Sequence, residues 1–224
     1  MKDLHGFLGS WNKVLKDVIE NSYVVNNLNI INVRYKYNRP MHPSQVDVFN
    51  AFKYCPYDKL SVVILGQDPY HDSNATGLAF ANPADTNKLS PSLQVIKDTV
   101  IRTVYKGSDY NFDPTLISWA RQGVLLLNVA LTSEGDKPLT NIKYWQDFTE
   151  GVLRKLSEIN SGIIYCLWGK YADSFSIFIN SNSNTILRYN HPAYSIYQGI
   201  PWECNHFIKI NEYLKNFNNK TIIW

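Results

Sequence analysis

Residues 60–71 read Leu-Ser-Val-Val-Ile-Leu-Gly-Gln-Asp-Pro-Tyr-His, an apolar run that ends abruptly in polar and turn-forming residues. A short, nearly continuous apolar run predicts a β-strand that is buried on both faces, as in a parallel sheet. Similar runs lie at 124–127 and 163–167, and a fourth, less continuous one lies at 185–189. Together the four runs predict about four parallel strands.

Helical patterns lie between and around these runs. Ser90 and Pro91 cap and start one helix that runs to residue 100, and a second helix follows Asp113-Pro114 up to residue 121. Strands separated by helices imply right-handed crossovers and a parallel sheet. The predicted fold class is therefore α/β: a three-layer α/β/α sandwich around a central four-stranded parallel sheet. Further helices are predicted at 10–20, from Pro43 to Phe52, at 145–159, at 171–179 and at 207–214.

The composition is typical of a globular protein. Of 224 residues, 45% are apolar and 18% are charged, which excludes disorder as the main state. With no internal repeat and no long linker, residues 1–224 are interpreted as a single domain. The net charge of +3 permits a nucleic-acid partner without requiring one. No apolar run reaches the roughly 18 residues of a membrane span, and no secretory signal is recognised, so we expect a cytoplasmic protein without a membrane partner.

The cysteines and histidines show no metal-binding spacing. Cys55, Cys166 and Cys204 are far apart and odd in number, which argues against both a disulfide framework and a zinc site. The five histidines form no HxxxH or similar pair. We therefore expect no metal site, and a reducing, intracellular environment fits the cysteines best.

Polar or small residues leave every predicted strand. They are Gly66 to His71 after the first run, Asn128 after the second, residues 168–170 after the third and residues 190–192 after the fourth. Because ligands of open α/β sheets bind beyond the carboxyl ends of the strands, these residues predict a cleft at one edge of the sheet. The alternative is that they only form turns, which Asp, Asn, Gly and Pro favour, and the spacing alone does not decide between the two interpretations.

The motifs themselves resemble a known family. Gln67-Asp68-Pro69-Tyr70-His71, followed by residues 77–80, is similar to the water-activating motif of the family 1 uracil-DNA glycosylases. Residues 119–128 resemble the uracil-reading segment, and Leu167-Trp168-Gly169 and His191-Pro192 match the remaining motifs in order. The resemblance extends over nearly the whole chain, from a helix at 45–52 to the closing residues 222–224.

The resemblance implies hydrolysis of the N-glycosidic bond of deoxyuridine in DNA, which yields uracil and an abasic site. The target nucleotide must then flip out of the duplex. Asp68 is expected to orient the attacking water and to stabilise the cationic sugar. His191 is expected to donate a hydrogen bond, as a neutral imidazole, to uracil O2. No cofactor is implied, since water is the second substrate.

The same resemblance assigns the base-binding residues. The amide of Asn128 is expected to pair with uracil N3–H and O4 and to reject cytosine. Tyr70 is expected to exclude the methyl group of thymine, and Phe80 to stack on the ring unless it serves only core packing. Gln67 is expected to contribute mainly backbone contacts. His71 is expected to support the loop or the water, although a direct role for it stays open.

The expected DNA contacts partly depart from the family pattern. Ser92, at a helix N-terminus, resembles the family's phosphate-binding serine. Lys170 stands where a serine commonly follows Trp-Gly, and it offers a phosphate a point charge. After His191 the chain is one residue shorter than Pro-Ser-Pro-Leu-Ser, and the usual intercalating leucine is missing. Tyr194 is the first candidate to replace it and Ile196 the second; Ser195 is a further candidate DNA contact.

Two rival functions stay open at this stage. One is a DNA-binding scaffold or polymerase accessory factor that kept the fold, as in some viral relatives of the family. The other is an α/β enzyme that acts on a free nucleotide. The leading expectation is an enzyme whose partner is uracil-containing DNA, single- or double-stranded. A protein inhibitor is a further partner to consider, and a monomer is the default oligomeric state.

Overall fold

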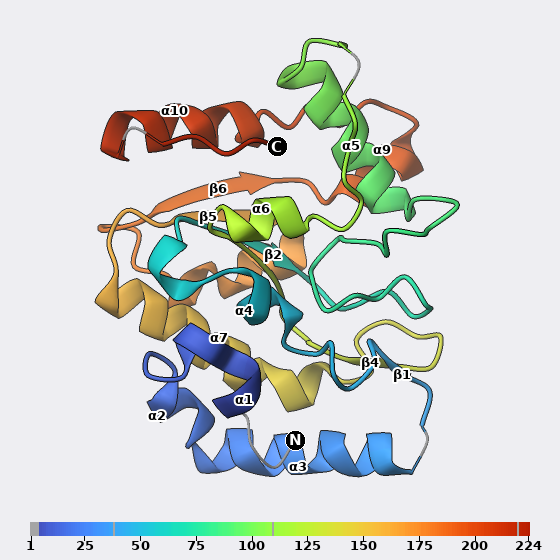
Figure 1. Cartoon of the computed structure of the whole chain (residues 1–224), viewed down its shortest axis with the longest axis vertical. Helices are drawn as coiled ribbons and strands as arrows, with labels where there is room; N and C mark the ends of the chain where they lie inside the picture. The colour runs from blue at the N-terminus through green and yellow to red at the C-terminus, as the bar shows by residue number, and fades with distance from the viewer. Residues whose placement is uncertain (1–4, 38, 109, 219) are drawn as a thin grey trace.

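The computed structural model of the chain describes residues 5–37, 39–108, 110–218 and 220–224 (Figure 1). Its centre is a parallel four-stranded sheet in the order β3-β2-β5-β6. The predicted four-stranded parallel sheet is therefore confirmed. The strands are β2 (Val62–Gly66), β3 (Val124–Asn128), β5 (Ile164–Trp168) and β6 (Thr185–Tyr189).

Helices cover both faces of the sheet, as predicted for a three-layer α/β/α fold. Figure 1 shows α5, α9 and α10 on one side of the sheet and α7 with the N-terminal helices on the other. All five residues of each of β2, β3 and β5 are buried, whereas β6 is only half-buried at the edge. The helices after β2 are α5 (Pro91–Thr103), α6 (Ile117–Arg121), α7 (Ile142–Ile159), α8 (Lys170–Asp173), α9 (Pro192–Gln198) and α10 (His206–Asn218).

The N-terminal region differs from the prediction. The prediction of one helix at 10–20 is wrong. The structure has a 3-10 turn, η1 (Gly9–Trp11), and a separate short helix, α2 (Lys16–Ile19). These follow a first turn of helix, α1 (His5–Leu8). A 15-residue helix that the pattern did not predict, α3 (Ser22–Lys36), packs against α7. Its apolar residues lie on both its buried and its exposed faces, so it lacks the one-sided stripe that identifies a surface helix.

Two other predicted helices differ in extent. The helix predicted from Pro43 begins only at Asn50 as α4 (Asn50–Tyr54), because residues 45–49 form turns. The segment 171–179 divides into α8 and a 3-10 helix, η3 (Ser174–Phe178). Residues 192–198, the segment that resembles the family's DNA-intercalating segment, form α9. A two-stranded ladder of β1 (Met41–His42) and β4 (Ser133–Glu134) and a 3-10 turn, η2 (Tyr57–Lys59), complete the fold.

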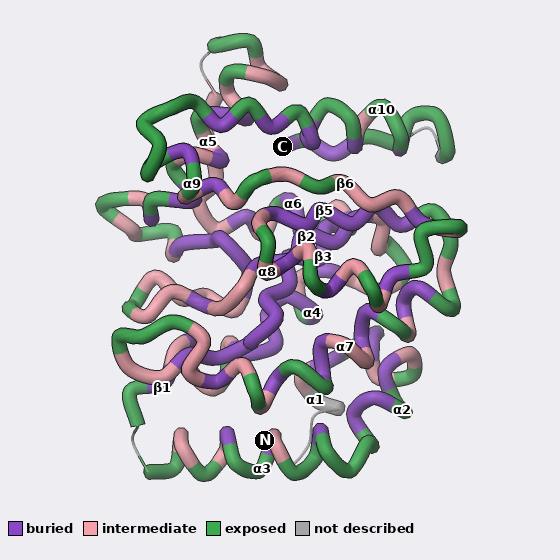
Figure 2. Tube along the Cα trace, turned by 180° about the vertical axis from the view of Figure 1, so that it is seen from behind, coloured by how far each residue is buried: buried purple, intermediate pink, exposed green. Residues whose placement is uncertain are grey.

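The buried residues follow the sheet (Figure 2). Many of them are aromatic. Trp145 shows how a polar group in the core finds a hydrogen-bond partner. Its ring is fully buried, and its Nε1–H donates to Thr132 Oγ1 at 2.7 Å. A buried indole N–H needs such a partner. The three cysteines are free and buried. Over the described residues, no helix is long and apolar enough to cross a membrane.

Candidate active site

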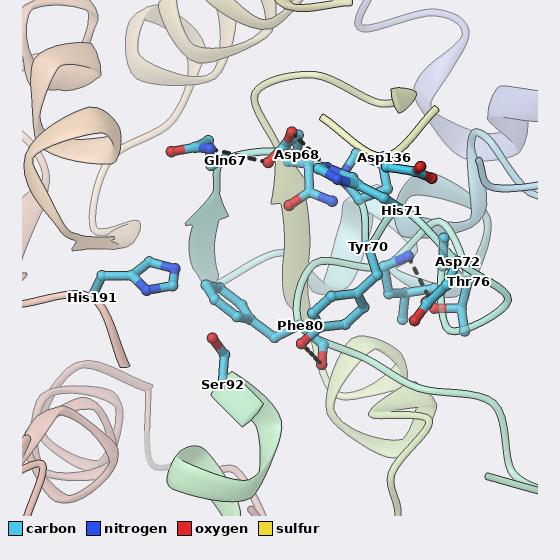
Figure 3. A pocket seen from close by; sticks show the side chains of 14 residues that line it. Gln67, Asp68, Tyr70, His71, Asp72, Thr76, Phe80, Ser92, Asp136 and His191 are labelled. Carbon is cyan, nitrogen blue, oxygen red and sulfur yellow. Dashed lines mark hydrogen bonds and ion pairs between the residues drawn. The ribbon is translucent and has the colours of Figure 1, made fainter. Parts of the chain in front are cut away.

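A pocket of about 410 Å³ opens beyond the carboxyl ends of the strands. The chain passes from β2 to β3 on one side and then to β5 on the other, so the strand order reverses between β2 and β5. This reversal is where open α/β sheets bind ligands. The six residues predicted for catalysis and base binding all line the pocket: Gln67, Asp68, Tyr70, Phe80, Asn128 and His191 (Figure 3).

The side chain of Asn128 occupies space that is open only because Gly66 has no side chain. The two residues are paired in the register of β2 and β3. A methyl group at Gly66 would lie 2.2 Å from Asn128 Oδ1 and 3.0 Å from Ala79 Cβ. Asn128 is only 7% exposed, and its amide makes no hydrogen bond to any other described residue. The amide atoms reach the open space of the pocket, so their free donor and acceptor can pair with a ligand there.

The carboxylate of Asp68 is held from three sides. The Leu139 backbone N–H donates to its Oδ2 at 2.7 Å, and His71 Nε2 lies 3.3 Å from the same oxygen. Gln67 Nε2 donates to Oδ1 at 3.1 Å. These bonds fix the orientation of a side chain that is only 9% exposed. The site therefore offers an immobilised acceptor at the mouth of the pocket.

The imidazole of His191 is held as a hydrogen-bond donor. His191 is the N-cap residue of α9, and its Nδ1 accepts the backbone N–H of Ala193 at 3.1 Å. Burial lowers the pKa of His191, and the opposing charge of Asp68 does not outweigh it. The ring is therefore neutral at pH 7, and because Nδ1 is an acceptor the proton resides on Nε2. Figure 3 shows the ring directed into the pocket in front of Phe80.

Phe80 and Tyr70 form one wall of the pocket. Phe80 has a left-handed backbone (φ +67°), which is strained for a residue with a large side chain. Its ring centroid lies 5.4 Å from that of Trp168 and 5.8 Å from that of His191. The Tyr70 hydroxyl donates to the Phe80 carbonyl at 3.2 Å. This bond ties the Tyr70 side chain to the Phe80 backbone and supports the strained turn.

A second layer of residues supports that wall. Trp168 Nε1–H donates to Nδ1 of His206 at 3.0 Å, and both side chains are buried. Burial lowers the pKa of His206 to about 4, so the acceptor nitrogen stays unprotonated at neutral pH. Next along the chain, a Cβ at Gly169 would lie 3.0 Å from His191 Cβ. Trp168 thus packs against Phe80, and Gly169 leaves room for His191.

The remaining predicted residues divide between the pocket and its surroundings. His71 and Ser92 line the pocket, Ser92 from the first turn of α5. Lys170 is exposed at the start of α8, outside the pocket. Tyr194 and Ile196 are exposed on α9. Ser195 is buried, and its hydroxyl donates to the Pro192 carbonyl at 2.8 Å.

Some site residues were not predicted. The Leu139 N–H is a backbone donor and leaves no mark in the sequence. Asp72, Thr76 and Asp136 also line the pocket. Asp72 and Thr76 stand within the segment that follows the Asp-Pro-Tyr-His motif, and this proximity was the available signal. Over the described residues, no group of three or more His, Cys, Asp or Glu side chains is arranged to hold a metal ion.

The fold and the site define an α/β protein whose sheet-edge pocket suits a planar, polar ring. A family model described as the uracil DNA glycosylase superfamily matches residues 52–215. A uracil-DNA glycosylase of Campylobacter jejuni (strain 81-176) is 37% identical over 96% of this chain and 92% of its own length. One of Francisella tularensis (strain WY96-3418) is 35% identical over 96% and 98%, respectively. The chain belongs to the uracil DNA glycosylase superfamily.

Solved structures agree with this assignment. The crystal structure of the mimivirus uracil-DNA glycosylase is similar with a TM-score of 0.88 and 25% identity, over 99% of this chain and 89% of that chain. A variant of the same viral protein has been solved in complex with UGI, a protein inhibitor. The predicted family and fold are confirmed.

Proposed function

We propose that this protein hydrolyses the N-glycosidic bond of deoxyuridine in DNA, releasing uracil and leaving an abasic site for repair. The observation that carries the proposal is the Asn128 amide, which has no hydrogen-bond partner among the described residues and shares a pocket with the Phe80 ring and the His191 imidazole. Membership of the superfamily supports the same reaction.

The amide of Asn128 suits uracil. Its oxygen accepts the N3–H of the base, and its NH₂ group donates to O4. Cytosine presents the opposite pattern, an acceptor at N3 and a donor at C4, which would leave both amide groups unpaired in a buried site. Sites that hydrogen-bond a substrate in this way reject a mismatched analogue strongly.

The aromatic residues recognise the shape of the base. Phe80 stacks on the flipped ring, a contact worth about 1–3 kcal/mol in comparable sites. Tyr70 lies against C5, where thymine carries a methyl group. Because the Tyr70 hydroxyl is bonded to the Phe80 carbonyl, the phenol cannot easily move aside for that methyl. Thymine is therefore excluded by a steric clash.

Asp68 and His191 perform the chemistry. Asp68 orients the water that attacks C1′ of the sugar, and its negative charge stabilises the developing oxocarbenium ion. The C1′–N1 bond breaks, and its electron pair moves onto the base. His191 donates its Nε2–H to uracil O2 as negative charge grows there. Water supplies the hydroxyl group to the sugar and a proton to the departing uracil.

DNA contacts lie around this pocket. Ser92 and the N-terminus of α5 receive a phosphate near the flipped nucleotide. Lys170 offers a charge to another phosphate, and Tyr194 enters the space that the flipped base vacates. Ser195 supports the first turn of α9 through its bond to the Pro192 carbonyl.

The test uses oligonucleotides with one deoxyuridine, single-stranded and duplex, and free deoxyuridine as a control. All reactions contain a chelator, and alkali cleaves the abasic product. We expect cleavage of both DNA forms, chromatographic release of uracil, no reaction with free deoxyuridine and inhibition by UGI. No cleavage by the folded protein would overturn the proposal in favour of a DNA-binding scaffold. Activity on free deoxyuridine alone would favour a nucleotide-processing enzyme.

A further inference from the structure

A buried amide closes the loop between the base-stacking residue and helix α5. Asn82 is fully buried, two residues after Phe80. Its Oδ1 accepts the backbone N–H of Ser90 at 2.7 Å, and its Nδ2 donates to Ser90 Oγ at 2.8 Å. Its own N–H donates to the carbonyl of Pro114 at 2.9 Å. Asn82 therefore anchors the whole loop 83–89 at both ends.

This bonding changes what Ser90 does for helix α5. Ser90 is the N-cap residue of α5, yet its side chain makes no capping hydrogen bond. Its hydroxyl accepts from Asn82 instead. Pro91 has no N–H, and among the described residues the N–H groups of Ser92 and Leu93 have no protein acceptor. The first turn of this 13-residue helix thus presents free donors beside the pocket.

The same pair of residues connects the helix to the base-binding wall. Tyr70 donates to the Phe80 carbonyl, and its hydroxyl also lies beside Ser90. Ser92 follows Ser90 by two residues, is 8% exposed and lines the pocket. Phe80, Tyr70 and Ser92 are consequently held in one arrangement through the contact of Asn82 with Ser90.

We propose that Asn82 is a positioning residue for DNA binding: it holds the N-terminus of α5, with Ser92, at a fixed distance from Phe80. In this arrangement a DNA phosphate is bound at Ser92 while the base of the flipped nucleotide stacks on Phe80. The inference rests on the proposed function, and it adds a residue that touches neither the phosphate nor the base.

The experiment is a double-mutant cycle. KM and kcat are measured on a single-stranded oligonucleotide with one deoxyuridine for wild type, Asn82→Ala, Ser92→Ala and the double variant. We expect KM to rise about 10-fold in each single variant, as for loss of one contact, with kcat within about 3-fold. Because Asn82 acts partly through the Ser92 hydroxyl, the KM of the double variant should rise by clearly less than the product of the two single effects. Asn87→Ala, which alters an exposed residue of the same loop, should match wild type.

Each of three outcomes would overturn the inference. The first is a wild-type KM in Asn82→Ala, and the second is a fall in its kcat of about 10-fold with no change in KM. The third is additivity of the two substitutions in their effects on KM. If Asn82→Ala does not fold, Ser90→Ala takes its place, since it removes one bond and keeps the other. Its effect on KM should also be smaller in the Ser92→Ala background than in wild type, and an additive effect would contradict the inference. An inactive wild-type protein would refute the proposed function itself, so the two failures are distinguishable.

Discussion

The side-chain amide of Asn128 lies over the Cα of Gly66, so close that a methyl group there would approach Asn128 Oδ1 to 2.2 Å. The backbone of Gly66 is not in the left-handed region, so alanine is conformationally allowed. Glycine is required for space alone. The base-reading amide thus depends on a residue of the neighbouring strand.

Gly66→Ala is therefore expected to displace the Asn128 amide and to lower kcat/KM for uracil-containing DNA by about 100-fold, roughly the effect of a lost buried pairing group. Steady-state kinetics of Gly66→Ala, Asn128→Ala and the double variant check this. The double variant should be no worse than Asn128→Ala. Additive losses would show that Gly66 acts on something other than the amide.

Tyr70→Ala is expected to release thymine from DNA at a measurable rate, because the space beside C5 is then open. The readout is abasic-site formation in an oligonucleotide whose uracil is replaced by thymine. Tyr70→Phe is the matched control: it keeps the ring but loses the hydrogen bond that holds it, so it should release thymine faster than wild type and much more slowly than Tyr70→Ala. Equal thymine release by both variants would place the discrimination elsewhere.

The lowered pKa of His191 predicts the pH profile of the reaction. The neutral donor is fully present above the usual histidine pKa of about 6.5 and is lost only as pH falls through the lower value in the folded protein. kcat should therefore show no loss from this group between pH 8 and the usual histidine pKa. His191→Ala should lose roughly 10²–10³ in kcat. A loss of wild-type kcat centred at or above the usual pKa would mean that the group is not held neutral.

The buried His206 predicts acid sensitivity of the fold. Its pKa falls from 6.5 to about 4 on folding, so the unfolded state binds the proton more readily. The stability contribution is fully present above pH 6.5 and declines as pH falls toward 4, by about 3 kcal/mol in total. Urea unfolding at several pH values measures it. His206→Gln should show a weaker decline over this interval, and an unchanged pH dependence would contradict the assignment.

Local patterns predicted the strands and the residues that leave them, since continuous apolar runs and the motif from Gln67 to His71 are read directly from the chain. The pairing of Asn82 with Ser90 and the Leu139 N–H bond to Asp68 were not predicted, because they join residues that only the folded chain brings together. Residues 10–20 showed helical spacing, yet tertiary packing divides them into two short elements. Propensity is a weak guide where packing decides.

The catalytic role of Asp68 is tested by the single-turnover rate of Asp68→Asn on a uracil-containing oligonucleotide, with DNA affinity measured in parallel. Asparagine keeps the size of the side chain and an acceptor for the Leu139 N–H but removes the negative charge. We predict a rate at least about 100-fold below wild type, with the dissociation constant for DNA within a few-fold. A rate equal to that of wild type would contradict the account, because hydrolysis would then not depend on the carboxylate that this pocket holds in place.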